Sequence, residues 1–218
     1  MNFKVLGFSK DNKTVAIADT VVQDGSGNGF ARVSVINVAK NSIITTVTGR
    51  DGDEESGSEE KALRNALAKL DLAKYGIVAG KNLGKTLVDR LPTDHSNVTN
   101  TVFSTENWAE GGASAILPKY ELAIASKPAA GDCDVPAMGM KLTLSAKEGK
   151  TTPINKVLQE DSSTLPKTRE CAYGYSVSKV VKSGSALLVA VRFSSPGFEG
   201  PTQSHIAVTT EANLNSGF

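Results

Sequence analysis

The sequence predicts a mainly β (α+β) protein: an N-terminal β-meander, a second, sandwich-like antiparallel sheet region, and one amphipathic helix packed across a sheet. Short runs rich in Val, Ile and Thr alternate with turn residues along most of the chain. Only one segment has a clear helical repeat of apolar residues. Its 218 residues, 39% hydrophobic and 22% charged, suit a globular protein with a buried core. We expect a single β-rich domain over residues 1–218.

We expect the meander in residues 1–50. The first expected strands, FKVLGF and TVAIADTVV, flank a turn at Asp11 and Asn12, two residue types that tolerate left-handed backbone. The strands RVSVINV and SIITTVTG follow. Apolar and polar residues alternate in RVSVINV, which is typical of a half-buried strand.

We expect the helix at residues 58–75. Leu and Ala recur there at helical spacing, and Gly76 supplies a stop. Ser56 and Glu59 have the spacing of a capping box, and Ser58 is an alternative N-cap. We expect the apolar stripe of this helix to pack against a sheet.

We expect the second sheet region in residues 99–212. A tight hairpin is expected at Ser183-Gly184. Residues 147–169, rich in Lys, Thr, Ser and Pro, are expected to form a long surface loop with one short element at NKVLQ. The candidate strands are TNTVFST, YELAIAS, GMKLTLSA, YSVSKVVK, ALLVAVRF and HIAVTTE.

Charge argues against a nucleic-acid partner, and hydropathy argues against a membrane span. The formal charge of +1 gives no general attraction to nucleic acid, and no dense Lys/Arg run is interleaved with aromatic residues. The longest uncharged apolar run, ALLVAV, is too short to span a membrane. Met1 leads directly into FKVLGF, so we expect this chain to carry no signal peptide. That start fits a cytosolic protein or a mature exported chain.

The run AGKNLGKT, residues 79–86, matches a loose phosphate-loop pattern. A phosphate loop needs a strand before the glycines and a helix after them. Here a helix comes first, and Pro92 soon ends whatever follows. We therefore expect no nucleotide binding at Lys85 and Thr86, and we interpret Gly80 and Gly84 as turn residues.

The acidic run DGDEESGSEE offers a weak metal site. Asp51, Asp53 and Glu55 would attract calcium loosely, and calcium is the only cofactor that the sequence suggests. The alternative is a solvated turn whose acids complement the N-terminus of the helix.

No catalytic arrangement is recognisable. The sequence has no GxSxG nucleophile elbow, and its two histidines stand in unlike contexts. Paired carboxylates of a glycosidase cannot be recognised from sequence, so a hydrolase stays open. The sequence favours a protein that is not an enzyme.

Cys133 and Cys171 lack CxxC spacing and a His-rich neighbourhood, which argues against a metal site. Spacing alone leaves two readings equally open: one disulfide, or two unrelated buried thiols.

Three segments, VLGFSKDNKTVAIADTVVQDGSG, LPKTRECAYGYSV and GFEGPTQSHIAVT, occur in this order. Together they resemble a bacterial family of predicted secreted proteins, domain of unknown function 2259. The resemblance covers nearly the whole chain and implies a secreted or periplasmic protein. Because such compartments are oxidising, it favours a Cys133–Cys171 disulfide. It transfers no catalytic residue.

Each of these three segments carries a charge beside residues that suit tight turns: Asp24, Arg169 and Glu199. We expect Arg169 to pair with Asp24 or Glu199, either as a buried structural clasp or as a binding site in a concavity. The alternative is three separate solvated turn residues.

The sequence therefore predicts a secreted or periplasmic, non-catalytic protein. Its expected partner is a protein, a polymer or a small ligand of the cell envelope, bound through a β-rich face. An unrecognised extracytoplasmic hydrolase is the alternative.

Overall fold

The computed structural model describes residues 1–23, 25–52, 57–91, 93–94, 98–105, 118–148, 153–197 and 200–214. The chain divides into two compact units. Unit 1 consists of Met1–Lys85, Lys182–Leu187 and Thr209–Glu211, and unit 2 of Thr86–Val181, Leu188–Val208 and Ala212–Phe218. The expectation that residues 1–218 behave as a single domain stays a prediction.

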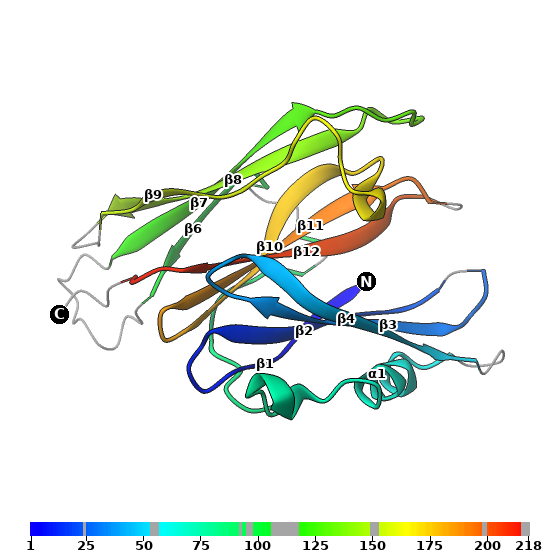
Figure 1. Ribbon diagram of the computed structural model, residues 1–218. Helices are drawn as coiled ribbons and strands as arrows, with labels where there is room; N and C mark the ends of the chain where they lie inside the picture. The colour runs from blue at the N-terminus through cyan, green and yellow to red at the C-terminus, as the bar shows by residue number, and fades with distance from the viewer. Residues whose placement is uncertain are drawn as a thin grey trace. The chain divides into compact units, whose positions relative to one another are not determined.

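Unit 1 is built on the predicted meander (Figure 1). Its antiparallel sheet has the order β1-β2-β3-β4. Asn12 and Asn41, in the turns after β1 and β3, have φ angles of 59° and 48°, a region that Asn tolerates better than most residues. The strands are β1 (Asn2–Phe8), β2 (Thr14–Val22), β3 (Gly29–Asn37) and β4 (Ser42–Asp51).

The predicted helix is shorter than residues 58–75. The α-helix α1 spans Glu59–Leu67, and a separate 3₁₀ helix, η1, spans Leu72–Tyr75. Ser58 is the N-cap, since its side chain accepts a hydrogen bond from the Lys61 amide; Ser56 lies outside the described residues. One continuous helix was a wrong expectation, because the Asp71 side chain accepts from the Ala73 amide and starts the new turn.

Helix α1 packs on one face of the meander. Ala62 and Ala66 lie in a buried cluster with Ala18, Ala31 and Val33 of the sheet. A Cβ at position 49 would collide with the Ala62 carbonyl, so glycine there lets the helix approach β4 closely. The apolar stripe therefore packs as the sequence predicted.

Unit 2 contains two antiparallel sheets that lie face to face (Figure 1), with the orders β6-β7-β8-β9 and β12-β11-β10-β5. The tip of the β10–β11 hairpin and the end of β12 belong to unit 1. The protein is therefore mainly β with a sandwich-like region, as predicted. The strands are β5 (Lys85–Asp89), β6 (Asn100–Ser104), β7 (Lys119–Pro128), β8 (Met138–Glu148), β9 (Asn155–Glu160), β10 (Tyr173–Ser183), β11 (Ala186–Ser195) and β12 (Thr202–Glu211).

The β6–β9 sheet shows why these segments form strands. Tyr120, Leu122 and Ile124 are buried on β7 and alternate with residues that are more exposed. On the opposite face, Lys119 pairs with Glu148 at 2.7 Å and Lys147 with Glu121 at 3.3 Å. This period of two gives the sheet one apolar face for the core and one charged face for solvent.

The structure bears on the local predictions for the phosphate-loop-like run. Gly80 and Gly84 both have φ of 76°, and Gly80 lies in a turn, as interpreted, whereas Gly84 directly precedes strand β5. Lys85 and Thr86 begin strand β5, which the sequence did not predict, instead of the helix that a phosphate loop requires. The lack of nucleotide binding stays a prediction.

Among the described residues, no helix is long and apolar enough to cross a membrane.

Candidate functional site

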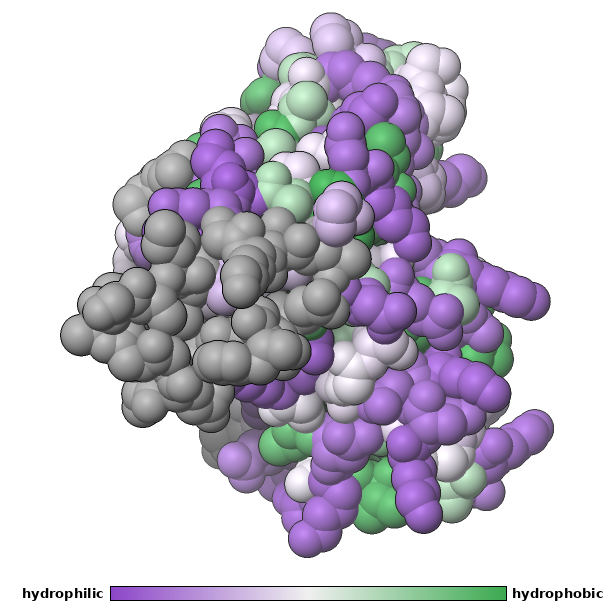
Figure 2. Space-filling view, turned by 90° about the vertical axis from the view of Figure 1, so that its left-hand side faces the viewer, coloured by the Kyte–Doolittle hydropathy of each residue, from purple (hydrophilic) through white to green (hydrophobic). Residues whose placement is uncertain are grey.

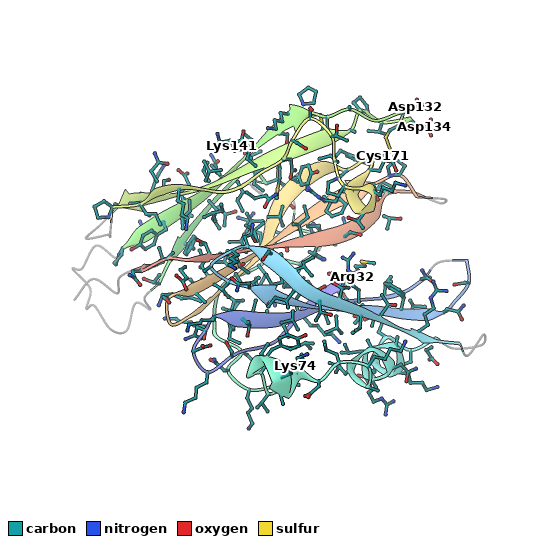
Figure 3. All side chains as sticks on the ribbon, viewed as in Figure 1. Arg32, Lys74, Asp132, Asp134, Lys141 and Cys171 are labelled. Atoms are coloured by element: carbon teal, nitrogen blue, oxygen red, sulfur yellow. A yellow bond between two sulfur atoms is a disulfide. The ribbon has the colours of Figure 1, made fainter. Side chains whose placement is uncertain are left out.

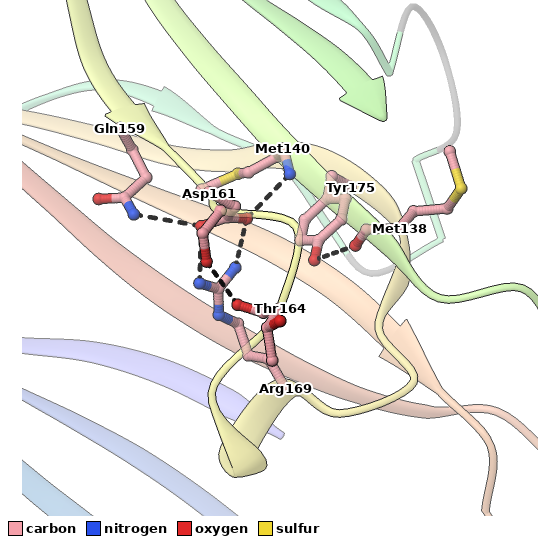
Figure 4. Close-up of polar contacts among 8 residues, drawn as sticks. Met138, Met140, Gln159, Asp161, Thr164, Arg169 and Tyr175 are labelled. Atoms are coloured by element: carbon pink, nitrogen blue, oxygen red, sulfur yellow. Dashed lines mark hydrogen bonds and ion pairs between the residues drawn. The ribbon is translucent and has the colours of Figure 1, made fainter. Parts of the chain in front are cut away.

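Arg169 forms a forked ion pair with Asp161 (Figure 4). Its Nη1 donates to Asp161 Oδ2 and its Nη2 to Asp161 Oδ1, each at 2.7 Å. Arg169 ends the 3₁₀ helix η2 (Lys167–Arg169), and Asp161 follows directly after β9. The side chains are only 11% and 2% exposed. The pair is therefore closed to solvent rather than open to a ligand.

Asp161 has two further donors. The Met140 amide donates to its Oδ2 at 2.8 Å and Gln159 Nε2 to its Oδ1 at 3.2 Å. Burial by itself would raise the pKa of Asp161, but the hydrogen bonds from Arg169 and Met140 and the charge of Arg169 outweigh it, so the pKa lies below its ordinary value. A carboxylate with four donors is a structural anchor: it fixes the loop after β9 to strand β8.

A disulfide holds the same loop two residues beyond Arg169. Cys133 and Cys171 are bonded, with 5.7 Å between their Cα atoms, which confirms the prediction. Cys133 lies between β7 and β8, flanked by Asp132 and Asp134, which Figure 3 shows beside Cys171. The ion pair and the disulfide thus tie the segment between β9 and β10 to the β7–β8 region.

Arg169 pairs with Asp161, a residue that the sequence analysis did not identify. Asp24 and Glu199 lie outside the described residues, so their roles stay predictions. Asp161 was missed because it lies eight positions before Arg169, across a loop, and no periodicity links two residues of a loop. The only available signal was an acidic residue directly after a strand-like run.

Asp51 has a structural role at the start of α1. It is 8% exposed, and its Oδ2 accepts from the Ser58 amide at 2.9 Å. An acid that complements a helix N-terminus was part of the expected alternative, but Asp51 is buried rather than in a solvated turn. Asp53 and Glu55 lie outside the described residues. Among the described residues, no group of three or more His, Cys, Asp or Glu could hold a metal ion. Calcium binding stays a prediction.

Unit 1 contains a hollow of about 450 Å³. Three segments form it: the turn between β1 and β2, the chain between η1 and β5, and the tip of the β10–β11 hairpin. We call this site the amide hollow, because two asparagine side chains lie at its centre. Its lining residues are Phe8, Lys10, Asn12, Gly76, Val78, Lys81, Asn82, Ser183 and Gly184.

A network of three side chains joins these segments. Ser183 Oγ lies 2.6 Å from Asn12 Oδ1 and 3.0 Å from Asn82 Oδ1. Asn82 Nδ2 donates to Asn12 Oδ1 at 3.4 Å and to the Ser9 carbonyl at 3.1 Å. The amide positions are therefore fixed by hydrogen bonds within the protein.

Local backbone conformation places both asparagines. Asn12 and Asn82 have φ of 59° and 46°, and the Phe8 amide donates to the Asn82 carbonyl at 2.9 Å. This bond and those from Asn82 Nδ2 fix residue 82 beside the end of β1. The phosphate-loop-like run thus supplies Lys81 and Asn82 to the hollow, while its Lys85 is absent from the lining.

The rest of the lining is cationic or apolar. Lys10 and Lys81 are exposed, and Val78 is 64% exposed. Phe8 is buried and forms part of the core. On the face shown in Figure 2, outside the grey atoms, apolar residues form small separate patches among hydrophilic ones. That face offers no broad apolar surface for docking.

Comparison with known proteins places the chain in a family. No curated protein and no solved structure gives a significant match. The family model described as "Predicted secreted protein (DUF2259)" matches residues 16–211, which includes all of the amide hollow except residues from β1 and the turn after it. The chain therefore belongs to the DUF2259 family of predicted secreted proteins.

Proposed function

We propose that this protein works outside the cytoplasm as a non-catalytic binding protein, and that the amide hollow receives a small polar ligand or the end of an envelope polymer. The observation that carries the proposal is the hollow itself: about 450 Å³, with polar side chains already held in place. Ligand sites are concave, largely pre-formed and provided with a few fixed polar groups.

The chemistry of the lining supports binding over hydrolysis. A serine nucleophile needs a base within hydrogen-bond reach. Ser183 Oγ has only the carboxamide oxygens of Asn12 and Asn82 beside it, and carboxamides are not bases at neutral pH. The described lining residues include no acid, histidine or cysteine. The hydrolase alternative therefore has no supporting observation at this site.

The clasp does not compete as a binding site. Each guanidinium nitrogen of Arg169 that faces Asp161 already donates to it, and the carboxylate is 2% exposed. A ligand would have to break a buried charge-assisted pair before it could bind there.

The test is a ligand screen with a variant that fills the hollow. We would measure the melting temperature with soluble sugars, sugar acids, sugar phosphates and peptidoglycan fragments, since a ligand that binds only the folded state raises it. Val78→Trp fills the hollow from an exposed position. Ile43→Trp is the matched control, because Ile43 is 65% exposed on β4 and outside the lining.

A compound that stabilises the wild type and Ile43→Trp, but not Val78→Trp, is the expected result. The proposal fails if no compound stabilises the wild type, or if Val78→Trp responds as strongly as the control.

A further inference from the structure

We infer that the amide hollow selects a ligand with an anionic group, a carboxylate or a phosphate, and that Lys10, Lys81 and the Asn12 amide nitrogen hold this group. The inference rests on the proposed function and adds the chemical class of the ligand.

The first argument is the charge of the lining. Among the described lining residues only Lys10 and Lys81 are charged, and both are cations. Neither has an ion-pair partner in the part of the chain that the structure describes. They come from different segments, so the fold brings two unmatched positive charges to one concavity. Two cations that share a site favour an anion between them.

The nearest acid in the sequence does not cancel these charges from within the hollow. Asp11 lies between Lys10 and Asn12 in the chain but is absent from the lining. Its Oδ1 accepts from Ser9 Oγ at 2.7 Å and from the Lys13 amide at 3.2 Å. These bonds and the nearby Lys13 ammonium, 3.6 Å from Oδ2, tie Asp11 to its own turn.

The polarity of the amide network points the same way. Asn12 Oδ1 accepts from Ser183 or Asn82, and Asn82 Oδ1 lies within hydrogen-bond distance of Ser183. The acceptor oxygens are thus occupied, whereas no described residue accepts from Asn12 Nδ2. A hollow whose available groups are an amide N–H and two ammonium groups suits an acceptor-rich ligand.

Gly184 leaves room at this donor. A Cβ at position 184 would lie 2.6 Å from Asn12 Nδ2, too close for that amide to keep its position. Glycine therefore lets the hairpin tip pass beside Asn12 while the amide nitrogen stays where it is.

The experiment compares matched probes that differ in charge. Glucose, glucuronate and glucose 6-phosphate share a ring and differ in the anionic group, and inorganic phosphate tests the group alone. A short oligogalacturonate asks whether the anion comes from a polymer rather than a free molecule. We would follow the backbone amides of Gly76 and Gly184 by NMR, because both residues line the hollow.

Three charge variants, Lys10→Gln, Lys81→Gln and Val78→Glu, test the lining residues, and two further variants are controls. Lys10→Gln and Lys81→Gln should each weaken binding of the anionic sugars about tenfold, the size expected for one hydrogen bond to a charged group. Lys40→Gln is the control, since Lys40 is an exposed lysine of the same unit outside the lining. Val78→Glu should abolish binding by like-charge repulsion, whereas Val78→Gln should retain most of it. Raising the salt concentration should weaken the anionic probes only.

The outcomes separate the two proposals. The inference is supported if an anionic probe binds at least tenfold more tightly than glucose and the three charge variants act as described. Glucose binding as tightly as its anionic counterparts would overturn the anion inference and leave the proposed function standing. If no probe perturbs Gly76 or Gly184, both proposals are contradicted.

Discussion

Asp161 and Arg169 in unit 2 form a closed pair, whereas Lys10 and Lys81 in unit 1 line a hollow whose described lining residues include no carboxylate. The difference follows from solvent exposure. A buried charge without a partner costs several kcal/mol, so a fold keeps Asp161 only together with its donors. An exposed lysine stays hydrated and needs no partner. Matched buried charge therefore marks a structural clasp, and the unmatched exposed charge of the amide hollow is where we propose that an anionic ligand binds.

The largest expected effect on stability comes from removing the disulfide that holds the same loop as the clasp. The double variant Cys133→Ser/Cys171→Ser should lower the free energy of unfolding by roughly 4 kcal/mol, because the bond closes a loop of 38 residues in the unfolded chain. Urea unfolding of the variant and of the oxidised wild type would measure this. The chemically reduced wild type should match the variant. A loss below about 1 kcal/mol would show that the ion pair alone fixes the loop.

Removing one partner of the pair comes next. Arg169→Ala should lower the free energy of unfolding by about 3 kcal/mol or more, because it leaves a buried carboxylate without its cation. Hydrogen exchange gives a local readout, since the Met140 amide donates to Asp161 at 2.8 Å and should lose protection.

The matched control for Arg169→Ala is the double variant Arg169→Ala/Asp161→Asn. It removes the unpaired charge and should recover part of the loss. If the double variant is no more stable than Arg169→Ala, the unpaired charge is not the cause.

The clasp also has a pH dependence of definite sign. In the folded protein the pKa of Asp161 lies below its ordinary value of 3.8. The stability that the ionised carboxylate contributes is therefore fully present above pH 3.8 and is lost as the pH falls through the lower pKa of the folded state. In Arg169→Ala, burial still raises the pKa of Asp161, but the hydrogen bonds and the charge of Arg169 no longer lower it. The pKa of Asp161 should therefore rise. The Asp161 carboxyl signal, followed by NMR, should therefore titrate at higher pH in the variant. An equal or lower pKa in Arg169→Ala would contradict this account.

The two sites also differ in how far the sequence predicted them. Cys133, Cys171 and Arg169 were identified because each has a type and a context that suggest pairing, and the disulfide is confirmed. Asp161 was missed because loop conformation decides which carboxylate reaches Arg169. The amide hollow was missed entirely, since Asn12, Asn82 and Ser183 meet only through tertiary structure.

Elements were predicted better than their boundaries. Strands with period-two alternation were found because burial on one face dictates that pattern. Strand β5 was missed because Lys85–Asp89 is partly exposed and too short to show it. The predicted helix was too long because Leu70 keeps the apolar repeat beyond α1 and packs against the same cluster, although the backbone has already left the helix.

The amide network itself should contribute a smaller amount to stability. Ser183→Ala removes the hydroxyl shared by Asn12 and Asn82, and the loss should be about 1 kcal/mol, the usual net value for one partly buried hydrogen bond. Ser185→Ala, an exposed serine in the same hairpin turn, is the matched control and should leave the free energy of unfolding unchanged. Equal effects of the two variants would mean that the network does not hold the three segments together.

The smallest expected effect on stability sharpens the comparison most. Lys10→Gln/Lys81→Gln should change the free energy of unfolding by less than about 0.5 kcal/mol, because both side chains are exposed and neither has an ion-pair partner among the described residues. Any change should be a slight gain, since two like charges near one another repel. Arg169→Gln, the same kind of charge removal at the clasp, should instead be strongly destabilising. Urea unfolding of both variants at low and high salt compares them directly. If the lysine variant were as unstable as Arg169→Gln, Lys10 and Lys81 would be structural residues, and their part in holding an anion would be lost with that result.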